Sequence, residues 1–125
     1  MTTANKKPRI TGMTLAVTEM EKMIEFYSEI FQLNFEKTEM YGATLYNTQI
    51  NDVAILFCPA EIAENTAKQN RHQLEFEVQD LKKILSVVKK HHGSTMGNPT
   101  ENDGIIQVGI NDPDNNSIVL KQIMN

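Results

Sequence analysis

The sequence predicts an α+β protein built from two tandem βαβββ modules, and three observations lead to this fold class. Short segments with alternating apolar residues, such as HQLEFEV at 72–78, are typical of strands. Two other segments carry apolar residues at helical spacing. These two segments, AVTEMEKMIEFY at 16–27 and EVQDLKKILSVV at 77–88, superpose when one is shifted by 61 residues. Each half therefore reads strand, helix and three strands, with the helices on one side of mostly antiparallel sheets.

The first half is expected to run from a strand at 10–17 directly into a helix. Thr18 and Glu21 form a T-x-x-E capping box, and apolar residues then keep helical spacing as far as Phe31. Three more strands are expected, at 33–40, 41–48 and 52–59.

The second half repeats this order after a polar connector. A strand at 72–78 leads to Asp80, which is expected to cap a helix that ends at His91, His92 and Gly93. The two imidazoles then lie near the negative end of the helix. The remaining segments are a poorly patterned strand or loop at 94–103, a strand at 104–110, a turn at 111–116 and a strand at 117–123.

Composition sets limits on the class of protein. A chain of 125 residues with 40% hydrophobic and 22% charged residues suits one globular domain. The net charge of −4 argues against binding to nucleic acid or to an anionic membrane surface. The sequence has no apolar run of membrane-spanning length, and its start lacks the apolar region of a secretory signal. A single cysteine, Cys58, excludes an internal disulfide and fits a cytoplasmic location.

The expected organisation is a flexible tail at 1–9 followed by a single domain at 10–125. Within this domain, module 1 covers about 10–60 and module 2 covers about 72–123.

Three stretches of the chain resemble one family. VTEMEKMIEFYSEIFQLNF at 17–35 resembles the V-x-D-x-x-x-x-x-x-F-Y-x-x-x-L-G-F opening of the vicinal oxygen chelate superfamily, which includes glyoxalase I, bleomycin-resistance proteins and extradiol dioxygenases. HQLEFEVQDL resembles its fifth strand and second helix, and NDPDNNSIVL resembles its closing D-P-D-G-N-x-I-E-L. The resemblance implies the glyoxalase/bleomycin-resistance fold, in which the modules form a cup-shaped sheet. Gln32 and Asn115 stand where the family usually has glycine.

The resemblance also implies where a metal would bind. Metal-dependent members hold a divalent cation with side chains, usually His, Glu, His and Glu, from the first, fourth, fifth and eighth strands. The matching residues here are Gly12, Leu56, Gln73 and Val119, and only Gln73 carries a donor atom. A divalent cation needs about three or more protein ligands, so we expect neither a metal nor another cofactor. His72, one residue before Gln73, has the parity of the apolar face and is expected to have no ligand role.

The same resemblance implies a ligand site on the concave side of the cup. The two-residue period of a strand places Gln73 and Glu75 on the face opposite Leu74 and Phe76. The residues expected to line the site are Thr14, Leu56, Gln73, Glu75, Val119 and Lys121, with Tyr46 rather than Tyr41 at the rim. Two alternatives stay open for the charged pair. Glu75 acts as a general base or binds an amine, or else Lys121 neutralises Glu75 on a solvated face. Cys58 is expected to be a small buried hydrophobe rather than a nucleophile.

The leading functional prediction is a cytoplasmic, metal-free protein that binds a small molecule and works as a homodimer. The dimer is implied by the resemblance to bleomycin-resistance proteins. The alternative is an enzyme of the same superfamily, a lyase, isomerase or dioxygenase-like protein, with Glu75 as acid/base or with an atypical metal site. A third possibility is a structural or regulatory module whose cup is filled with side chains.

Overall fold

The computed structural model describes residues 10–40, 42–64, 67–68 and 72–124. The first nine residues, for which a flexible tail is predicted, lie outside this part of the chain. The α+β fold class is confirmed: the described residues form two four-stranded sheets with two α-helices. No helix among them is long and apolar enough to span a membrane.

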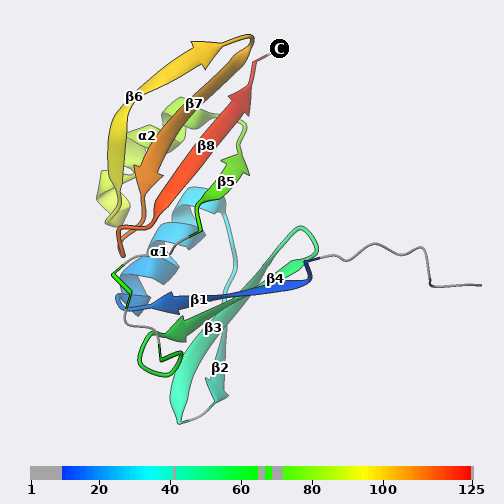
Figure 1. Cartoon of the computed structure of the whole chain (residues 1–125), viewed down its shortest axis with the longest axis vertical. Coiled ribbons are helices and arrows are strands. Elements are labelled where there is room, and N and C mark those ends of the chain that lie inside the picture. The colour runs from blue at the N-terminus through cyan, green and yellow to red at the C-terminus, as the bar shows by residue number, and fades with distance from the viewer. Residues whose placement is uncertain (1–9, 41, 65–66, 69–71, 125) are drawn as a thin grey trace, which may run out of the picture.

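Sheet 1 belongs to module 1 and has the strand order β1-β4-β3-β2 (Figure 1). Its elements are β1 (Gly12–Val17), α1 (Met20–Phe31), β2 (Glu36–Met40), β3 (Ala43–Ile50) and β4 (Val53–Pro59). The pairing of β1 with β4 is parallel, and helix α1 and two strands form the long connection that a parallel pair needs. The other two pairings are antiparallel.

Sheet 2 belongs to module 2 and has the corresponding order β5-β8-β7-β6. Its elements are β5 (Leu74–Glu77), α2 (Leu81–Val87), the short 3₁₀-helix η1 (Lys89–His91), β6 (Ser94–Asn102), β7 (Ile105–Asn111) and β8 (Ser117–Ile123). The pairing of β5 with β8 is parallel and the others are antiparallel, as in sheet 1. The shared order is consistent with the two predicted modules. The poorly patterned segment that begins at Ser94 is a strand, β6.

The start of β2 differs from the prediction. Strand β2 begins at Glu36 rather than at Leu33, because Leu33 and Phe35 pack against the core from the segment between α1 and β2. Gln32, which ends α1, has the left-handed backbone conformation that usually favours glycine.

The capping box predicted at the start of α1 is wrong. Glu19 occupies the N-cap position and its side chain makes no capping hydrogen bond. The Thr18 hydroxyl instead donates to Asp114 Oδ1 at 2.7 Å, and the Asp114 carboxylate also accepts the backbone N–H groups of Thr18 and Glu19. The start of α1 is therefore capped by a residue of module 2. At the start of α2, by contrast, the Asp80 carboxylate accepts the N–H of Lys83, as predicted.

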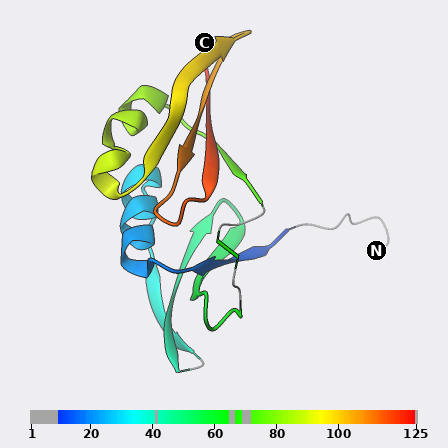
Figure 2. The ribbon, with the colours of Figure 1, turned by 60° about the vertical axis from the view of Figure 1, so that its left-hand side comes forward.

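Both sheets pack one face into a common apolar core around α1. In Figure 2 the two helices lie on the same side of the molecule. The core draws on α1, on both sheets and on α2, and includes Phe26, Ile30, Leu15, Phe57, Val108, Ile110, Ile118, Leu120 and Leu81. Because side chains alternate along each strand, the opposite face of each sheet points away from this core. We call these surfaces the outer faces of sheet 1 and sheet 2.

The turn between β7 and β8 joins the two modules through a buried carboxylate. Asp112, which is 2% exposed, accepts hydrogen bonds from the Tyr27 hydroxyl, the backbone N–H groups of Asp114 and Asn116, and Asn116 Nδ2. Burial raises the pKa of the Asp112 carboxyl, although these hydrogen bonds act in the opposite direction. Burial, and then the charge of Asp112, raise the pKa of Tyr27 well above its ordinary value. Asn115 adopts the left-handed conformation expected of it in this turn.

The segment after α2 makes a second contact between the modules. His91 Nδ1 lies 3.0 Å from Glu25 Oε2 and His92 Nε2 lies 3.2 Å from Glu25 Oε1, so both imidazoles contact α1. The hydrogen bond with His91, and then that with His92, lower the pKa of Glu25. At Gly93 the chain approaches α1 so closely that a Cβ atom would lie 2.4 Å from Phe26 Cε1. Gly93 is therefore needed for this close packing. The left-handed backbone conformation at the end of η1 is adopted by His92 instead.

Candidate functional site

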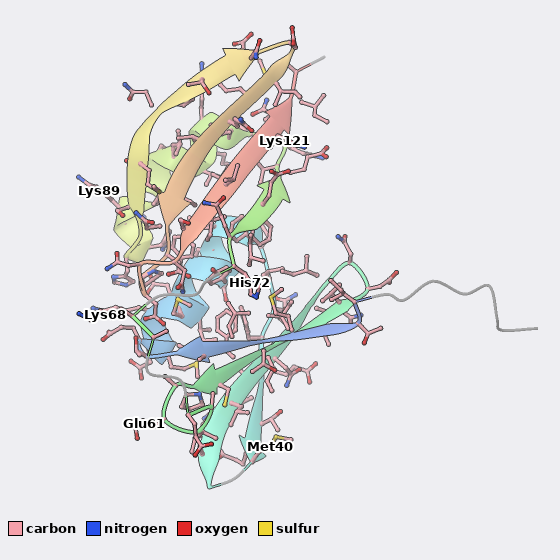
Figure 3. All side chains as sticks on the ribbon, in the orientation of Figure 1. Met40, Glu61, Lys68, His72, Lys89 and Lys121 are labelled. Atoms are coloured by element: carbon pink, nitrogen blue, oxygen red, sulfur yellow. The ribbon has the colours of Figure 1, made fainter. Side chains whose placement is uncertain are left out.

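The outer face of sheet 2 brings together four of the predicted site residues. Glu75 of β5 is the register partner of Val119 on β8, and Lys121 lies two residues further along β8. Lys121 Nζ is 3.2 Å from Glu75 Oε2 (Figure 3 labels Lys121). Gln73 Nε2 donates to the Ser117 hydroxyl at 2.9 Å. Polar groups therefore flank Val119 on both sides.

A hollow lies on this face between β5 and the hairpin formed by β6 and β7. Its volume is about 330 Å³, and it is lined by Glu75, Thr100, Asn102, Asp103, Ile105, Gln107 and Lys121. The β6 and β7 residues of this lining are absent from the predicted set. Residues 94–103 lack the alternation that would reveal which side chains share a face, so only the observed register identifies the β6 residues Thr100 and Asn102.

The outer face of sheet 1 carries the other two candidates that remain in place. Thr14 of β1 is the register partner of Leu56 on β4; Thr14 is exposed and Leu56 is half-buried. A hollow of about 580 Å³ extends from Leu56 and Ala54 across Asn47 and Gln49 to the segment after α1. Both neighbours of Thr14 on this side of β1, Gly12 and Ala16, are small. Around Thr14 this face presents small side chains, and across the hollow it presents the amides of Asn47 and Gln49 and the carboxylate of Glu36.

Tyr46 lies on the other face of sheet 1 from the site. It is the register partner of Phe57 and packs against the apolar core. The structure therefore separates it from Thr14 and Leu56, whose side chains point to the outer face. Cys58 is buried, as its expected role as a small hydrophobe requires. His72 is exposed just before β5, between the two sheets in the view of Figure 3.

The donor groups on the outer faces do not fit the cation site of metal-dependent relatives. Gly12 and Leu56 offer no side-chain ligand in sheet 1, and Val119 offers none in sheet 2. The amide of Gln73 is already hydrogen-bonded to Ser117. Among the residues that the structure describes, no group of three or more His, Cys, Asp or Glu side chains is arranged to hold a metal ion. One neutral amide oxygen is too weak a ligand set for a divalent cation.

Glu75 is the candidate acid/base, and its surroundings bear on that role. Its side chain is 54% exposed and paired with Lys121. A carboxylate that acts as a general base through desolvation needs an enclosed, apolar position, which a single chain does not give Glu75. The pair is better suited to holding a polar ligand group than to removing a proton.

The comparisons with known proteins agree with this geometry. The model of the Glyoxalase/Bleomycin resistance protein/Dioxygenase superfamily matches residues 9–120. No curated protein matches the sequence significantly.

Several solved structures share the fold. One is a glyoxalase/bleomycin resistance protein/dioxygenase family enzyme from Burkholderia phytofirmans PsJN, with a TM-score of 0.74 and 16% identity over 91% of this chain and 98% of that one. Another is TnmS3, an antibiotic binding protein from Streptomyces sp. CB03234, with a TM-score of 0.69 and 16% identity over 94% and 97%. The fosfomycin resistance protein FosX from Mesorhizobium loti has a TM-score of 0.69 and 16% identity over 94% and 93%. At these identities the likeness concerns the fold.

Proposed function

The chain belongs to the Glyoxalase/Bleomycin resistance protein/Dioxygenase superfamily, and from this premise we propose that it binds a small organic molecule without a metal. The ligand lies between the outer face of sheet 1 and the outer face of sheet 2. The observation that carries the proposal is the arrangement around Val119, where a hydrogen-bonded amide and an ion pair flank an apolar residue on an accessible sheet face. Alternating polar and apolar groups of this kind orient a small ligand.

The two outer faces meet when two copies of the chain associate. Within one chain both sheets turn toward the common core, so their outer faces point away from it. Strands β1 and β5 each end a sheet, and in the described part of the chain each has one edge without a partner strand. Strand β1 carries neither a charge nor a proline, the devices that usually protect an exposed edge, whereas the other edge strands, β2, β5 and β6, carry charged residues.

Pairing β1 of one protomer with β5 of its partner covers both edges. It also places Thr14 and Leu56 beside the partner's polar face of sheet 2. Each protomer offers both strands, so the contact is reciprocal and closes as a two-fold dimer with two sites. A cytoplasmic location fits a protein whose one cysteine is a buried free thiol.

Two of the structural neighbours support the class of ligand. TnmS3 is described as antibiotic binding and FosX as a fosfomycin resistance protein, so both names refer to small organic molecules. Their names place no particular ligand in this chain. The polar groups of sheet 2 and the small residues of sheet 1 favour a compact molecule with several hydrogen-bonding groups.

The test is a thermal-shift screen over small aromatics, thiols and peptides. Hits are repeated with Gln73→Ala, Glu75→Gln and Leu56→Asp, and with Glu39→Gln on the distant strand β2 as the matched control. We expect at least one compound to raise the unfolding midpoint of the wild-type protein and of Glu39→Gln, but less in the three site variants. A screen without hits, or hits that all three site variants retain in full, would overturn the proposal.

The dimer has a separate test at Thr14. The carbonyls of Thr11 and Val17 accept N–H groups from the β4 side, so the two-residue period directs the N–H of Thr14 to the free edge. Thr14→Pro removes that donor without removing a β1–β4 hydrogen bond, and Thr14→Val keeps it. We expect light scattering to give a dimer mass for the wild type and Thr14→Val and a monomer mass for Thr14→Pro. A wild-type monomer at micromolar concentration would contradict this arrangement.

A further inference from the structure

A row of four residues crosses the outer face of sheet 2 and contains a glycine beside a methionine. Register pairing places Glu75, Val119, Gly109 and Met96 side by side on β5, β8, β7 and β6. The next row in one direction contains Glu77, Lys121, Gln107 and Thr100. The row on the other side contains Ser117, Asn111 and Ser94, with Gln73 hydrogen-bonded to Ser117 and Asn111 hydrogen-bonded to Ser94. Val119, Gly109 and Met96 therefore form an apolar strip, with Glu75 at its β5 end. This strip lies between the row that contains Lys121 and the row of amides and hydroxyls.

The glycine in this strip leaves room for the methionine. A Cβ atom at position 109 would lie 3.2 Å from Met96 Sδ and 3.4 Å from Met96 Cβ. The thioether therefore lies directly over the backbone of β7. A glycine inside a strand weakens it, and such a residue often marks a place where another group approaches the backbone closely.

Two more observations concern Met96 itself. Met96 is 50% exposed on β6, the edge strand of sheet 2, so its thioether is accessible to a ligand. The register between β6 and β7 shifts directly after it, between Met96 and Thr100, and Gly97 has a positive φ of 76°. A bulge at this point turns the strand and fixes the direction in which the neighbouring side chain points.

On the basis of the proposed function, we infer that Met96, lying over Gly109, is the ligand-contacting surface of sheet 2 and selects molecules with a flat aromatic ring. A thioether is polarizable and makes favourable contacts with aromatic rings. Val119 continues the same strip, so a system of one or two fused aromatic rings lies on Met96 and Val119. The flanking rows then meet polar substituents at opposite edges of the ring, with amides and hydroxyls on one side and the Lys121–Glu75 pair on the other.

The inference is tested with two probes of matched size, 2-naphthol and its fully saturated analogue decahydro-2-naphthol. The full chain is labelled with ¹³C at the methionine and leucine methyl groups. The Met96 signal is assigned from its loss in Met96→Leu, and the Leu56 signals from their loss in Leu56→Asp. We expect 2-naphthol to move the Met96 methyl signal upfield through its ring current. Met96→Ala is expected to weaken 2-naphthol binding by about three- to tenfold and binding of the saturated probe by less than about twofold.

Met40 provides the matched control. It is 42% exposed on β2, at the opposite end of the molecule from β6 (Figure 3). Met40→Ala is expected to leave the 2-naphthol affinity unchanged, while Gly109→Ala, which displaces Met96, weakens it. Met96→Leu keeps the volume of the side chain but lacks the thioether. An unfolding midpoint equal to that of the wild type in this variant shows that loss of binding does not come from unfolding.

The outcomes separate this inference from the proposal on which it rests. If 2-naphthol shifts the Leu56 methyl signals while the Met96 signal and the Met96→Ala affinity stay unchanged, the site binds a ligand but Met96 does not select it. If 2-naphthol does not bind, or the saturated probe binds equally well and with the same dependence on Met96, the selection of aromatic rings is overturned. In that case the proposed function is still tested separately, by the thermal-shift screen.

Discussion

The contact between the modules and the outer faces of the sheets are built in opposite ways. At the contact, Asp112, Tyr27 and Gly93 are closely fitted to particular atoms of their neighbours. On the outer faces, Glu75 and Lys121 form one partly exposed ion pair, and Thr14 has only a register partner. Substitutions at the contact are therefore expected to change stability, whereas substitutions on the outer faces change ligand binding. The closing stretch NDPDNNSIVL supplies both regions, through Asp112 and Asp114 and then through Val119.

The largest expected effect belongs to Gly93→Ala. Its Cβ would lie 2.4 Å from Phe26 Cε1, 2.7 Å from the Asn111 carbonyl oxygen and 3.0 Å from Val88 Cγ1, and backbone cannot move aside as a flexible side chain does. We expect the free energy of unfolding to fall by about 3 kcal/mol, measured by urea denaturation. Gly12→Ala, whose Cβ meets only the Ala54 carbonyl oxygen at 3.5 Å, is the control and should change it by less than about 0.5 kcal/mol. Equal effects would mean that the modules do not fit as closely as the structure shows.

Asp112→Ala comes next. The substitution removes the acceptor of four hydrogen bonds and leaves the Tyr27 hydroxyl and the Asn116 amide without it in a buried position. The expected loss is about 2 kcal/mol of unfolding free energy. Asp52→Ala, in the exposed turn between β3 and β4, removes the same charge and should have little effect. A small loss at Asp112 would show that the turn holds without its central carboxylate.

The buried hydroxyl of Tyr27 predicts a dependence on alkaline pH. Because burial and the charge of Asp112 raise its pKa, folded Tyr27 keeps its proton where an unfolded tyrosine, with a pKa near 10, releases it. The folded state then binds more protons than the unfolded state, so stability falls as the pH rises above 10. We expect a loss of about 1 kcal/mol by pH 11 from this residue.

The measurement compares urea denaturation at pH 9, 10 and 11 in the wild type, Tyr27→Phe and Tyr46→Phe. Tyr27→Phe is less stable at pH 9 because it lacks the hydrogen bond to Asp112. The comparison therefore uses the slope of the unfolding free energy against pH rather than its value at one pH. The slope should become shallower in Tyr27→Phe and stay the same in Tyr46→Phe. The same slope in all three proteins would remove Tyr27 as its source.

A smaller effect distinguishes the two possible caps of α1. Asp114→Ala removes the carboxylate that accepts three hydrogen bonds at the start of the helix, and should lower the unfolding free energy by about 1 kcal/mol. Glu21→Ala removes the residue that the sequence pattern assigns to the cap, and should cost only about 0.3 kcal/mol through the helix dipole. Circular dichroism during denaturation measures both. A larger loss at Glu21 would restore the capping box.

This cap shows where prediction from the sequence ends. The alternating strands and the two helices follow from local patterns, and the faces of β1, β4, β5 and β8 follow from the two-residue period. A local sequence pattern pairs Thr18 with Glu21, because such a pattern considers only neighbouring residues. It cannot include the carboxylate of Asp114, which is 96 residues away in the chain. For the same reason the pattern assigns Tyr46 to the rim, while the register with Phe57 places it in the core. The places of Met96 and Thr100 on the outer face require the bulged register of β6, which no periodicity in residues 94–103 encodes.

On the outer face, at Lys121, we expect a change in ligand binding with little change in stability. An ion pair with a carboxylate that is 54% exposed contributes little to folding, so Lys121→Ala should change the unfolding free energy by less than about 0.5 kcal/mol. The same substitution should reduce the thermal shift produced by compounds that bind the wild type, because it removes the cation next to the hollow. Lys89→Ala on η1, far from Lys121 in Figure 3, is the control for the loss of one positive charge. If Lys121→Ala lowered stability as much as Asp112→Ala while binding was retained, the outer face would be a structural surface, and the contrast between the two regions would disappear.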